Sequence, residues 1–166
     1  MARIGTFVVI GAIILSMSVA MYMYYQYQPN YITSNSGEPL IVGPIEYAIT
    51  FDGTHNGNKD TKPEHTFVKI RINAKNVSNE PVRISGGQFY LIDEKLQKHE
   101  AVYGGFSEED LLDDTLEPNK PVSWTTQFDV PYDETKQFSI TIKPLKPQDT
   151  LDVGTICITN CNALKP

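Results

Sequence analysis

Residues 67–75 read FVKIRINAK, and this stretch decides the fold of the chain. Apolar residues occupy every second position from Val68 to Ala74, and polar residues from Lys69 to Lys75 occupy the positions between them. Successive side chains of a strand point to opposite faces of a sheet, so this alternation predicts a β-strand with one buried face and one exposed face.

The same period of two recurs on both sides of this stretch. We expect further strands at residues 45–51, 82–84, 88–93, 99–103, 122–130, 138–142 and 151–159. Turn residues separate these runs at about 8–12-residue intervals, which is typical of sandwiches. The pattern predicts an all-β fold, an immunoglobulin-like antiparallel β-sandwich of seven to nine strands with Trp124 in its core. One short helix is expected at residues 107–112, with Ser107 as its N-cap.

The N-terminal part of the chain differs from the rest in composition. Residues 4–25 contain no charge over 22 positions. As a helix this stretch is about 33 Å long, enough to cross a hydrocarbon core of about 30 Å. Tyrosines at positions 22, 24, 25, 27 and 31 lie at its C-terminal end and just beyond it, and they suit a membrane interface. We predict a single transmembrane helix; a cleaved signal ending near Ser18–Ala20 and a buried core helix are the alternatives.

The charges that flank this stretch predict its orientation. Arg3 is the only basic side chain before it, and the next is Lys59. The positive-inside rule then predicts a single-pass cell-membrane protein with a cytoplasmic N-terminus and an extracytoplasmic domain. The expected organisation is a signal-anchor at residues 1–25, a polar linker at 26–39 and the sandwich at 40–166.

Composition excludes several classes of function. The net charge of −6 argues against binding of nucleic acid, whose phosphates require clustered Lys and Arg. It also argues against adhesion to anionic lipid head groups. The sequence contains no nucleophile elbow, Cys–His signature or phosphate-binding loop, so we do not expect an enzyme.

Cys157 and Cys161 predict a disulfide, because paired thiols outside the cytoplasm usually oxidise. Four residues of a straight strand span about 13 Å, whereas a disulfide joins Cα atoms less than about 7 Å apart. Residues 158–160 must therefore turn. A soft metal such as copper, or free thiols, are the alternatives for this pair.

Two groups of oxygen-bearing side chains are candidates for calcium. The first is Asp52, Asn56, Asn58 and Asp60, although it lacks the EF-hand pattern and these residues are also common in loops. The second is the acidic run Glu108, Glu109, Asp110, Asp113 and Asp114, whose alternative is a solvated helix start. No other cofactor is expected.

Residues 76–78 read NVS, which is a glycosylation sequon in an expected turn. If the chain meets a glycosylation machinery outside the cytoplasm, Asn76 is the predicted acceptor.

Four motifs occur in a fixed order along residues 45–144: the strand and turn at 68–76, FYLID at 89–93, LEPN at 116–119 and FDVP at 128–131. In this order they resemble the telokin-like family of immunoglobulin-like domains, which is common in bacterial and archaeal lipoproteins and anchored surface proteins and has no known function. Asn119 replaces the family's usual glycine, and the apolar stretch replaces a lipid-carrying cysteine. The resemblance implies an extracytoplasmic interaction or accessory domain, with no catalytic residues to transfer.

Two functional hypotheses follow. The first is a membrane-anchored accessory domain that binds a protein partner in the cell envelope, as a subunit of a membrane complex. The second is an extracytoplasmic domain that binds calcium or copper.

Overall fold

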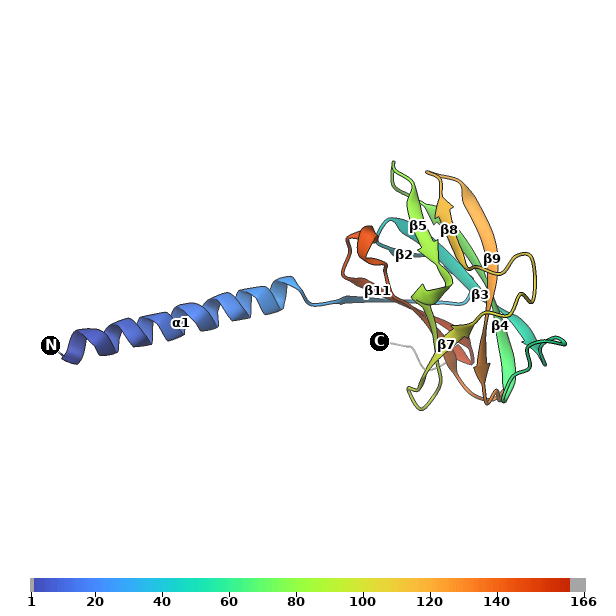
Figure 1. Ribbon diagram of the computed structural model, residues 1–166, viewed down its shortest axis with the longest axis horizontal. Coiled ribbons are helices and arrows are strands. Elements are labelled where there is room, and N and C mark those ends of the chain that lie inside the picture. Colours follow the sequence, from blue (N-terminus) through green and yellow to red (C-terminus); the bar gives the residue numbers. More distant parts are fainter. Residues whose placement is uncertain (1, 162–166) are drawn as a thin grey trace. The chain divides into compact units, whose positions relative to one another are not determined.

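The chain begins with α1 (Ala2–Gln26), shown in Figure 1; the structure is a computed structural model that describes residues 2–161. Among these residues, Phe7–Gln26 is the one helical stretch long and apolar enough to cross a membrane, properties that a signal sequence shares. The chain divides into two compact units, Met1–Asn30 and Tyr31–Pro166. The first contains α1, and its described side chains from residue 7 to residue 26 are exposed.

Eleven strands form most of the regular structure of the described chain after α1. They are β1 (Asn30–Asn35), β2 (Leu40–Val42), β3 (Ile45–His55), β4 (Thr66–Asn76), β5 (Val82–Ser85), β6 (Phe89–Ile92), β7 (Lys98–Val102), β8 (Asp113–Leu116), β9 (Pro121–Val130), β10 (Phe138–Ile142) and β11 (Asp152–Thr159). Two 3-10 helices, η1 (Gly86–Gln88) and η2 (Lys146–Gln148), lie between strands. The all-β prediction is confirmed, although seven to nine strands was too few.

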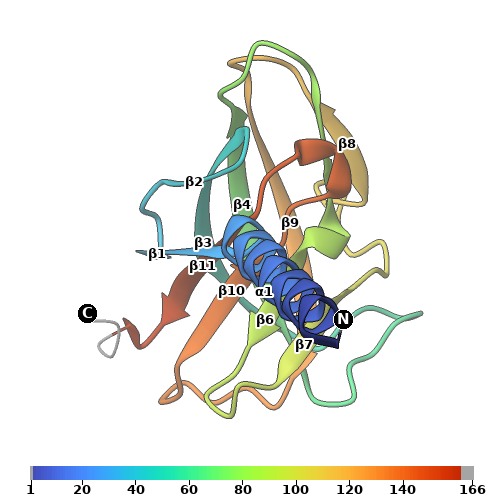
Figure 2. The ribbon, with the colours of Figure 1, turned by 90° about the vertical axis from the view of Figure 1, so that its left-hand side faces the viewer.

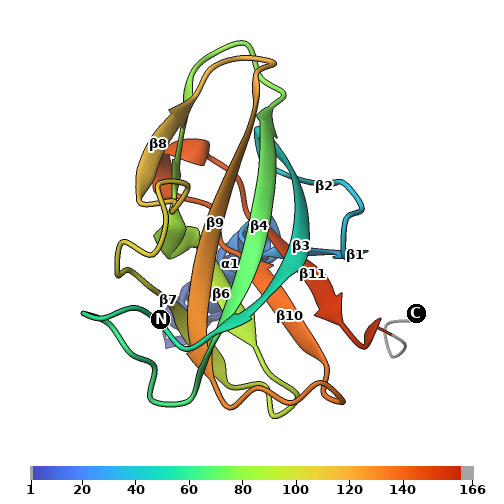
Figure 3. The ribbon, with the colours of Figure 1, turned by 90° about the vertical axis from the view of Figure 1, so that its right-hand side faces the viewer.

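Nine strands form one sheet, in the order β1-β11-β10-β6-β7-β9-β4-β3-β2. Strand β7 pairs with β6 through residues up to Glu100 and with β9 from Ala101 onward, so the sheet changes layers at this strand. Figure 3 shows β9, β4 and β3 in front of β6, β10 and β11. Strands β5 and β8 form a separate antiparallel pair. The arrangement is the predicted β-sandwich.

One segment supplies both edges of the nine-stranded sheet. Strands β1 and β2 are adjacent in sequence but stand at opposite ends of the strand order. Figure 2 shows both on the left side of the sandwich. The turn between them donates a hydrogen bond from Gly37 N to Ile49 O of β3 (2.9 Å). The two layers are therefore joined at this side by residues 30–42.

The predicted linker at residues 26–39 is wrong in part. It contains β1, and the second compact unit begins at Tyr31 rather than at residue 40. Strand β1 reads NYITSN, which is polar and mostly exposed, so it has no clear period of two. Its place beside β11 depends on a partner more than 100 positions away in the chain, which local pattern does not reveal.

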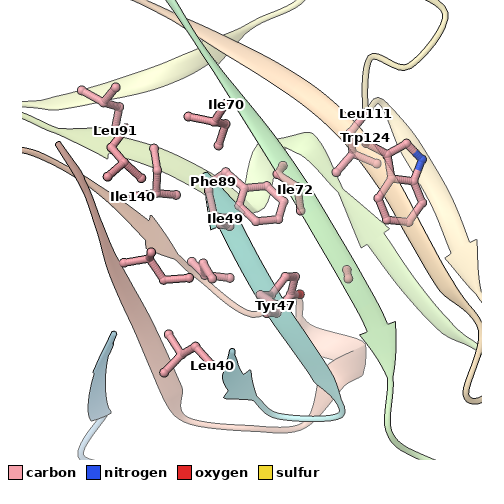
Figure 4. Close-up of a cluster of buried hydrophobic side chains, with 14 of the residues drawn as sticks. Leu40, Tyr47, Ile49, Ile70, Ile72, Phe89, Leu91, Leu111, Trp124 and Ile140 are labelled. Carbon is pink, nitrogen blue, oxygen red and sulfur yellow. The ribbon is translucent and has the colours of Figure 1, made fainter. Parts of the chain in front are cut away.

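The core lies between the two layers. Ile70 and Ile72 of β4 are fully buried and meet side chains from the opposite layer, such as Leu91 and Ile140 (Figure 4). The rings of Tyr47 and Phe89 contact edge to face, with centroids 5.8 Å apart. Trp124 belongs to the same cluster, as predicted. The exposed Asn73 and the buried Ile72 and Ala74 show the alternation expected of β4.

The helix predicted at residues 107–112 does not form. The carboxylate of Asp110 accepts hydrogen bonds from the backbone N–H groups of Phe106 and Ser107 (2.8 and 3.2 Å), which holds a turn. Leu111 N then donates to Thr125 O of β9 (2.9 Å). The segment lies against β9, so bonds to a strand replace the intrahelical bonds that capping by Ser107 was expected to begin.

Candidate functional site

A network of charged side chains lies on the outer side of β3 and β4. Asp52 Oδ2 contacts Lys69 Nζ at 3.4 Å and Arg71 Nη2 at 3.3 Å. Arg71 Nη1 also binds Glu109 Oε2 at 3.0 Å. The hydrogen bond that Arg71 donates to Glu109 and the negative charge of Asp52 raise the pKa of Arg71. Lys69 and Arg71 occupy polar positions of the alternating stretch 67–75. The alternation therefore predicted that they lie on the exposed face, but it did not predict their ion pairs with Asp52 and Glu109.

A hollow of about 220 Å³ adjoins this network. Asp52, Lys69, His55, Asn58 and Phe106 are among its lining residues. A break in the regular pairing of β3 with β4, between Phe51 and Thr54, precedes it. Such irregularities re-aim side chains at the end of a strand. The hollow thus combines charged groups with an aromatic wall.

His55 connects the loop to that wall. Its Nδ1 accepts a hydrogen bond from Gly57 N (3.1 Å), and its ring contacts those of Phe67 and Phe106, with centroids 5.2 and 5.1 Å apart. Its Nε2 is buried and has no hydrogen-bond partner. Burial, followed by the positive charge of Lys69, lowers the pKa of His55, and Asp110 opposes the shift. The geometry requires a neutral imidazole with the proton on Nε2.

Two of the four residues proposed as calcium ligands, Asp52 and Asn58, have other contacts. Asn58 Oδ1 accepts hydrogen bonds from the N–H groups of Asp60 (3.0 Å) and Thr61 (2.7 Å), which form a turn. Asp52 is paired with two cations, whereas Asn56 and Asp60 lie in the loop after β3. Residues 2–161 contain no group of three or more His, Cys, Asp or Glu side chains placed to hold a metal ion. Calcium would have to displace Lys69 and Arg71 from Asp52.

The side chains of the acidic run at residues 108–114 bind different partners. Glu109 binds Arg71, Asp110 holds the turn, and Asp113 Oδ1 lies 3.3 Å from Arg83 Nη2. These carboxylates do not converge on one point.

The predicted disulfide between Cys157 and Cys161 is confirmed, with Cα atoms 5.6 Å apart. Strand β11 ends at Thr159, and Asn160 reverses the chain with φ of +50°. The Asn160 side chain donates to the carbonyls of Glu134 (2.6 Å) and Lys136 (2.8 Å), which fixes this turn. Neither cysteine is free, so the copper alternative for this pair is contradicted.

Asn76 is a structural residue, and its prediction as a glycosylation acceptor is wrong for the folded domain. The side chain is fully buried. Its Nδ2 donates to the carbonyls of Glu80 (2.7 Å) and Leu116 (2.9 Å), and its Oδ1 accepts from Ser78 N (2.9 Å) and Ser78 Oγ (2.7 Å). An amide with all these partners inside the protein is not accessible to a transferase.

A second hollow, of about 400 Å³, lies on the outer side of the other layer. Ser139, Thr141 and Thr155 of β10 and β11 line it together with Leu96 from the β6–β7 turn. Leu96 is 83% exposed and has φ of +61°. The sequence predicted strands at residues 88–93 and 99–103 with turn residues between them, so neither this hollow nor the exposed leucine was predicted.

Comparison with family models shows the family to which this sandwich belongs. Residues 34–149 match the family described as a domain of unknown function, DUF4352. The chain belongs to the DUF4352 family. The match begins within β1 and ends after η2, so it covers β2 to β10 and leaves out most of β1 and all of β11. No curated protein sequence matches the chain.

Solved structures share the DUF4352 sandwich at low sequence identity. The yjhA protein of Bacillus subtilis is 15% identical, with a TM-score of 0.58 over 75% of this chain and 98% of that one. The B. subtilis protein ycdA, a candidate lipoprotein, is 18% identical, with a TM-score of 0.59 over 75% of this chain and 39% of that one. MPT63, a secreted protein of Mycobacterium tuberculosis, is 10% identical, with a TM-score of 0.54 over 75% and 97%. At these identities the similarity shows the fold alone.

Proposed function

We propose that this DUF4352 protein is an extracytoplasmic accessory domain that α1 holds at the cell membrane and that binds a protein partner in the envelope. The observation that carries the proposal is α1 itself. Its exposed surface over residues 7–26 carries no charge and is long enough to cross a hydrocarbon core, and it ends four positions before β1. A lipoprotein candidate and a secreted protein among the structural neighbours fit this location.

The proposal includes the finer predictions made from sequence. The N-terminus lies in the cytoplasm, α1 crosses the membrane once and is not cleaved, and the domain belongs to the telokin-like group of immunoglobulin-like sandwiches. The Cys157–Cys161 disulfide is consistent with an oxidising compartment. The domain acts by binding and not by catalysis.

Location and binding are tested together on the native protein. Membranes are washed in alkaline carbonate and then extracted in a mild nonionic detergent, and the complex is analysed by intact-mass measurement. We expect a full-length mass, resistance to carbonate, and a stoichiometric companion protein. External protease should degrade the domain in intact cells from which any outer barrier has been removed. A mass that begins near residue 21, or a protein released by carbonate, would overturn the anchored location.

A further inference from the structure

A hollow of about 130 Å³ forms where β7 changes partners. Tyr90 of β6 pairs with Glu100 of β7, and the next residue, Ala101, pairs instead with Phe128 of β9. The two strands therefore separate at this point. Tyr90, Glu100, Tyr103 and Gly87 line the opening between them. Its volume suits the end of a side chain rather than a whole small-molecule ligand.

The rings of Tyr90 and Tyr103 line the opening together with Glu100, and we call this site the tyrosine hollow. Tyr103 is 48% exposed and packs beside Gly86, where a Cβ would lie only 3.0 Å from its Cε1 and hydroxyl oxygen. The glycine thus leaves room for the ring. The ammonium group of Lys98 lies over the Tyr90 ring, with Nζ 3.6 Å from the ring centroid, so this ring already makes one cation–π contact. Aromatic faces attract ammonium and guanidinium groups through the ring quadrupole.

Two acidic side chains lie near the hollow, Glu100 and Asp113, and each is paired with a basic side chain of the same domain. Partial burial, then the charges of Asp113 and Glu100 and the neighbouring Tyr90, raise the pKa of Tyr103. The Glu100 side chain is 79% exposed, and the ion pair that it makes with Lys98 is long at 3.7 Å. Asp113 pairs with Arg83 at 3.3 Å. Glu100 therefore keeps accessible oxygens that can accept further N–H bonds.

We propose that the tyrosine hollow binds the side chain of a lysine or arginine from a protein partner, with the cation against Tyr90 and Tyr103 and an N–H bond to Glu100. The inference deepens the proposed accessory role, on which it rests, because it gives the partner a basic surface complementary to a chain of net charge −6. A primary ammonium or guanidinium fits better than a quaternary ammonium lipid head group, which has no N–H to donate to Glu100.

The test uses full-length protein with ¹³C-labelled tyrosine rings, in a nonionic detergent that contains no choline. The probe is the capped peptide Gly-Gly-Lys-Gly-Gly, and the matched peptide carries an Nε-acetylated lysine that lacks the charge. We expect the Tyr90 and Tyr103 ring signals to shift with the lysine peptide. The acetylated peptide should bind at least about fivefold more weakly. The trimethyl-lysine peptide should bind more weakly than the lysine peptide.

Substitutions separate the two kinds of contact. Tyr103→Leu should abolish the Tyr90 shift, whereas Tyr103→Phe, which keeps the ring, should retain it. Glu100→Gln should weaken lysine binding about two- to fivefold and reduce its dependence on salt. Tyr132→Leu is the control, because Tyr132 lies outside the hollow and stacks on Phe51 and Phe138; it should not change binding.

Three outcomes would overturn the inference. They are equal binding of the acetylated peptide, tighter binding of the trimethyl peptide, and no ring shift at millimolar lysine peptide. Each of these leaves carbonate resistance and co-purification unaffected. Failure of the hollow can therefore be distinguished from failure of the proposed membrane role.

Discussion

Asn76 shows how one buried side chain joins three parts of the sandwich. It ends β4, and its amide binds the turn that follows and the carbonyl of Leu116 at the end of β8. The backbone of Asn76 also accepts a hydrogen bond from Asn119 N (2.9 Å), so the two motif turns contact each other. The sequence predicted a glycosylation sequon in a turn at NVS, and the burial of Asn76 shows that its side chain holds the turn instead.

Removal of the Asn76 amide should destabilise the domain. Asn76→Ala leaves buried carbonyl and N–H groups without partners, so we expect a loss of about 3 kcal/mol in the free energy of unfolding. Asn73→Ala is the matched control, because Asn73 lies exposed on the same strand and should change stability by less than about 0.5 kcal/mol. Urea unfolding followed by Trp124 fluorescence measures both. Similar values for the two variants would contradict this role of Asn76.

His55 should make stability depend on acidity. Its pKa is lowered in the folded state, so the unfolded chain binds the proton more readily. The contribution of neutral His55 is complete above about pH 6.5, the ordinary value, and decreases as the pH falls below it towards the folded pKa. His55→Gln keeps an acceptor for Gly57 without the titration. Unfolding measured at about pH 7 and pH 5.5 should show a smaller acid loss in this variant; an unchanged loss would reject the prediction.

At the scale of elements, prediction succeeded where a strand is long and half-buried. Strands β4 and β9 pair over ten positions, and their inward residues are apolar or aromatic except for the buried Thr126, so the period of two is visible in both. Strands β1, β2 and β8 were missed for different reasons. Strand β2 has three residues, and β8 reads DDTL with a single buried residue, Leu116. Their positions depend on partners elsewhere in the fold.

The candidate sites were predicted less well for a related reason. The sequence marked the group around Asp52 as a calcium candidate and the two cysteines as a disulfide. In each case the members stand close together in the chain and have side chains typical of such a site. It did not mark Tyr90 and Tyr103, which come together only because β7 separates from β6. Lys69 and Arg71 were assigned to an exposed face, but their shared carboxylate comes from β3 and follows from strand pairing.

The contact between β11 and β2 gives a prediction for Gly154. A Cβ at this position would lie 2.6 Å from Val42 Cγ2 and 2.9 Å from Leu40 Cδ2. Gly154→Val should therefore push β2 from β11 and reduce stability by about 1–3 kcal/mol. Gly87→Ala is the control, because its Cβ would make only ordinary contacts at 3.7 Å or more. Thermal unfolding of the two variants and of the unchanged protein gives their melting temperatures. An unchanged melting temperature for Gly154→Val would contradict the close packing.

At the scale of the whole molecule, membrane attachment should depend on the centre of α1. Ile14→Arg together with Leu15→Arg places two charges at mid-helix, each costing about 2.5–3.5 kcal/mol in a membrane. We expect this chain to leave the carbonate-resistant membrane fraction. Gln26→Arg is the control, since a charge at the helix end reaches the interface. Retention of the double variant in the membrane would argue against a spanning α1.

Residues 30–42 supply the strands at both edges of the nine-stranded sheet, β1 and β2. A shortened chain that starts at residue 40, the boundary suggested by composition, would lack β1 and leave the N–H and C=O groups along one side of β11 uncovered. Uncovered strands recruit strands from other molecules. Such a chain should self-associate, whereas one that starts at residue 28 should stay monomeric. The polar stretch after the helix thus protects the domain against aggregation.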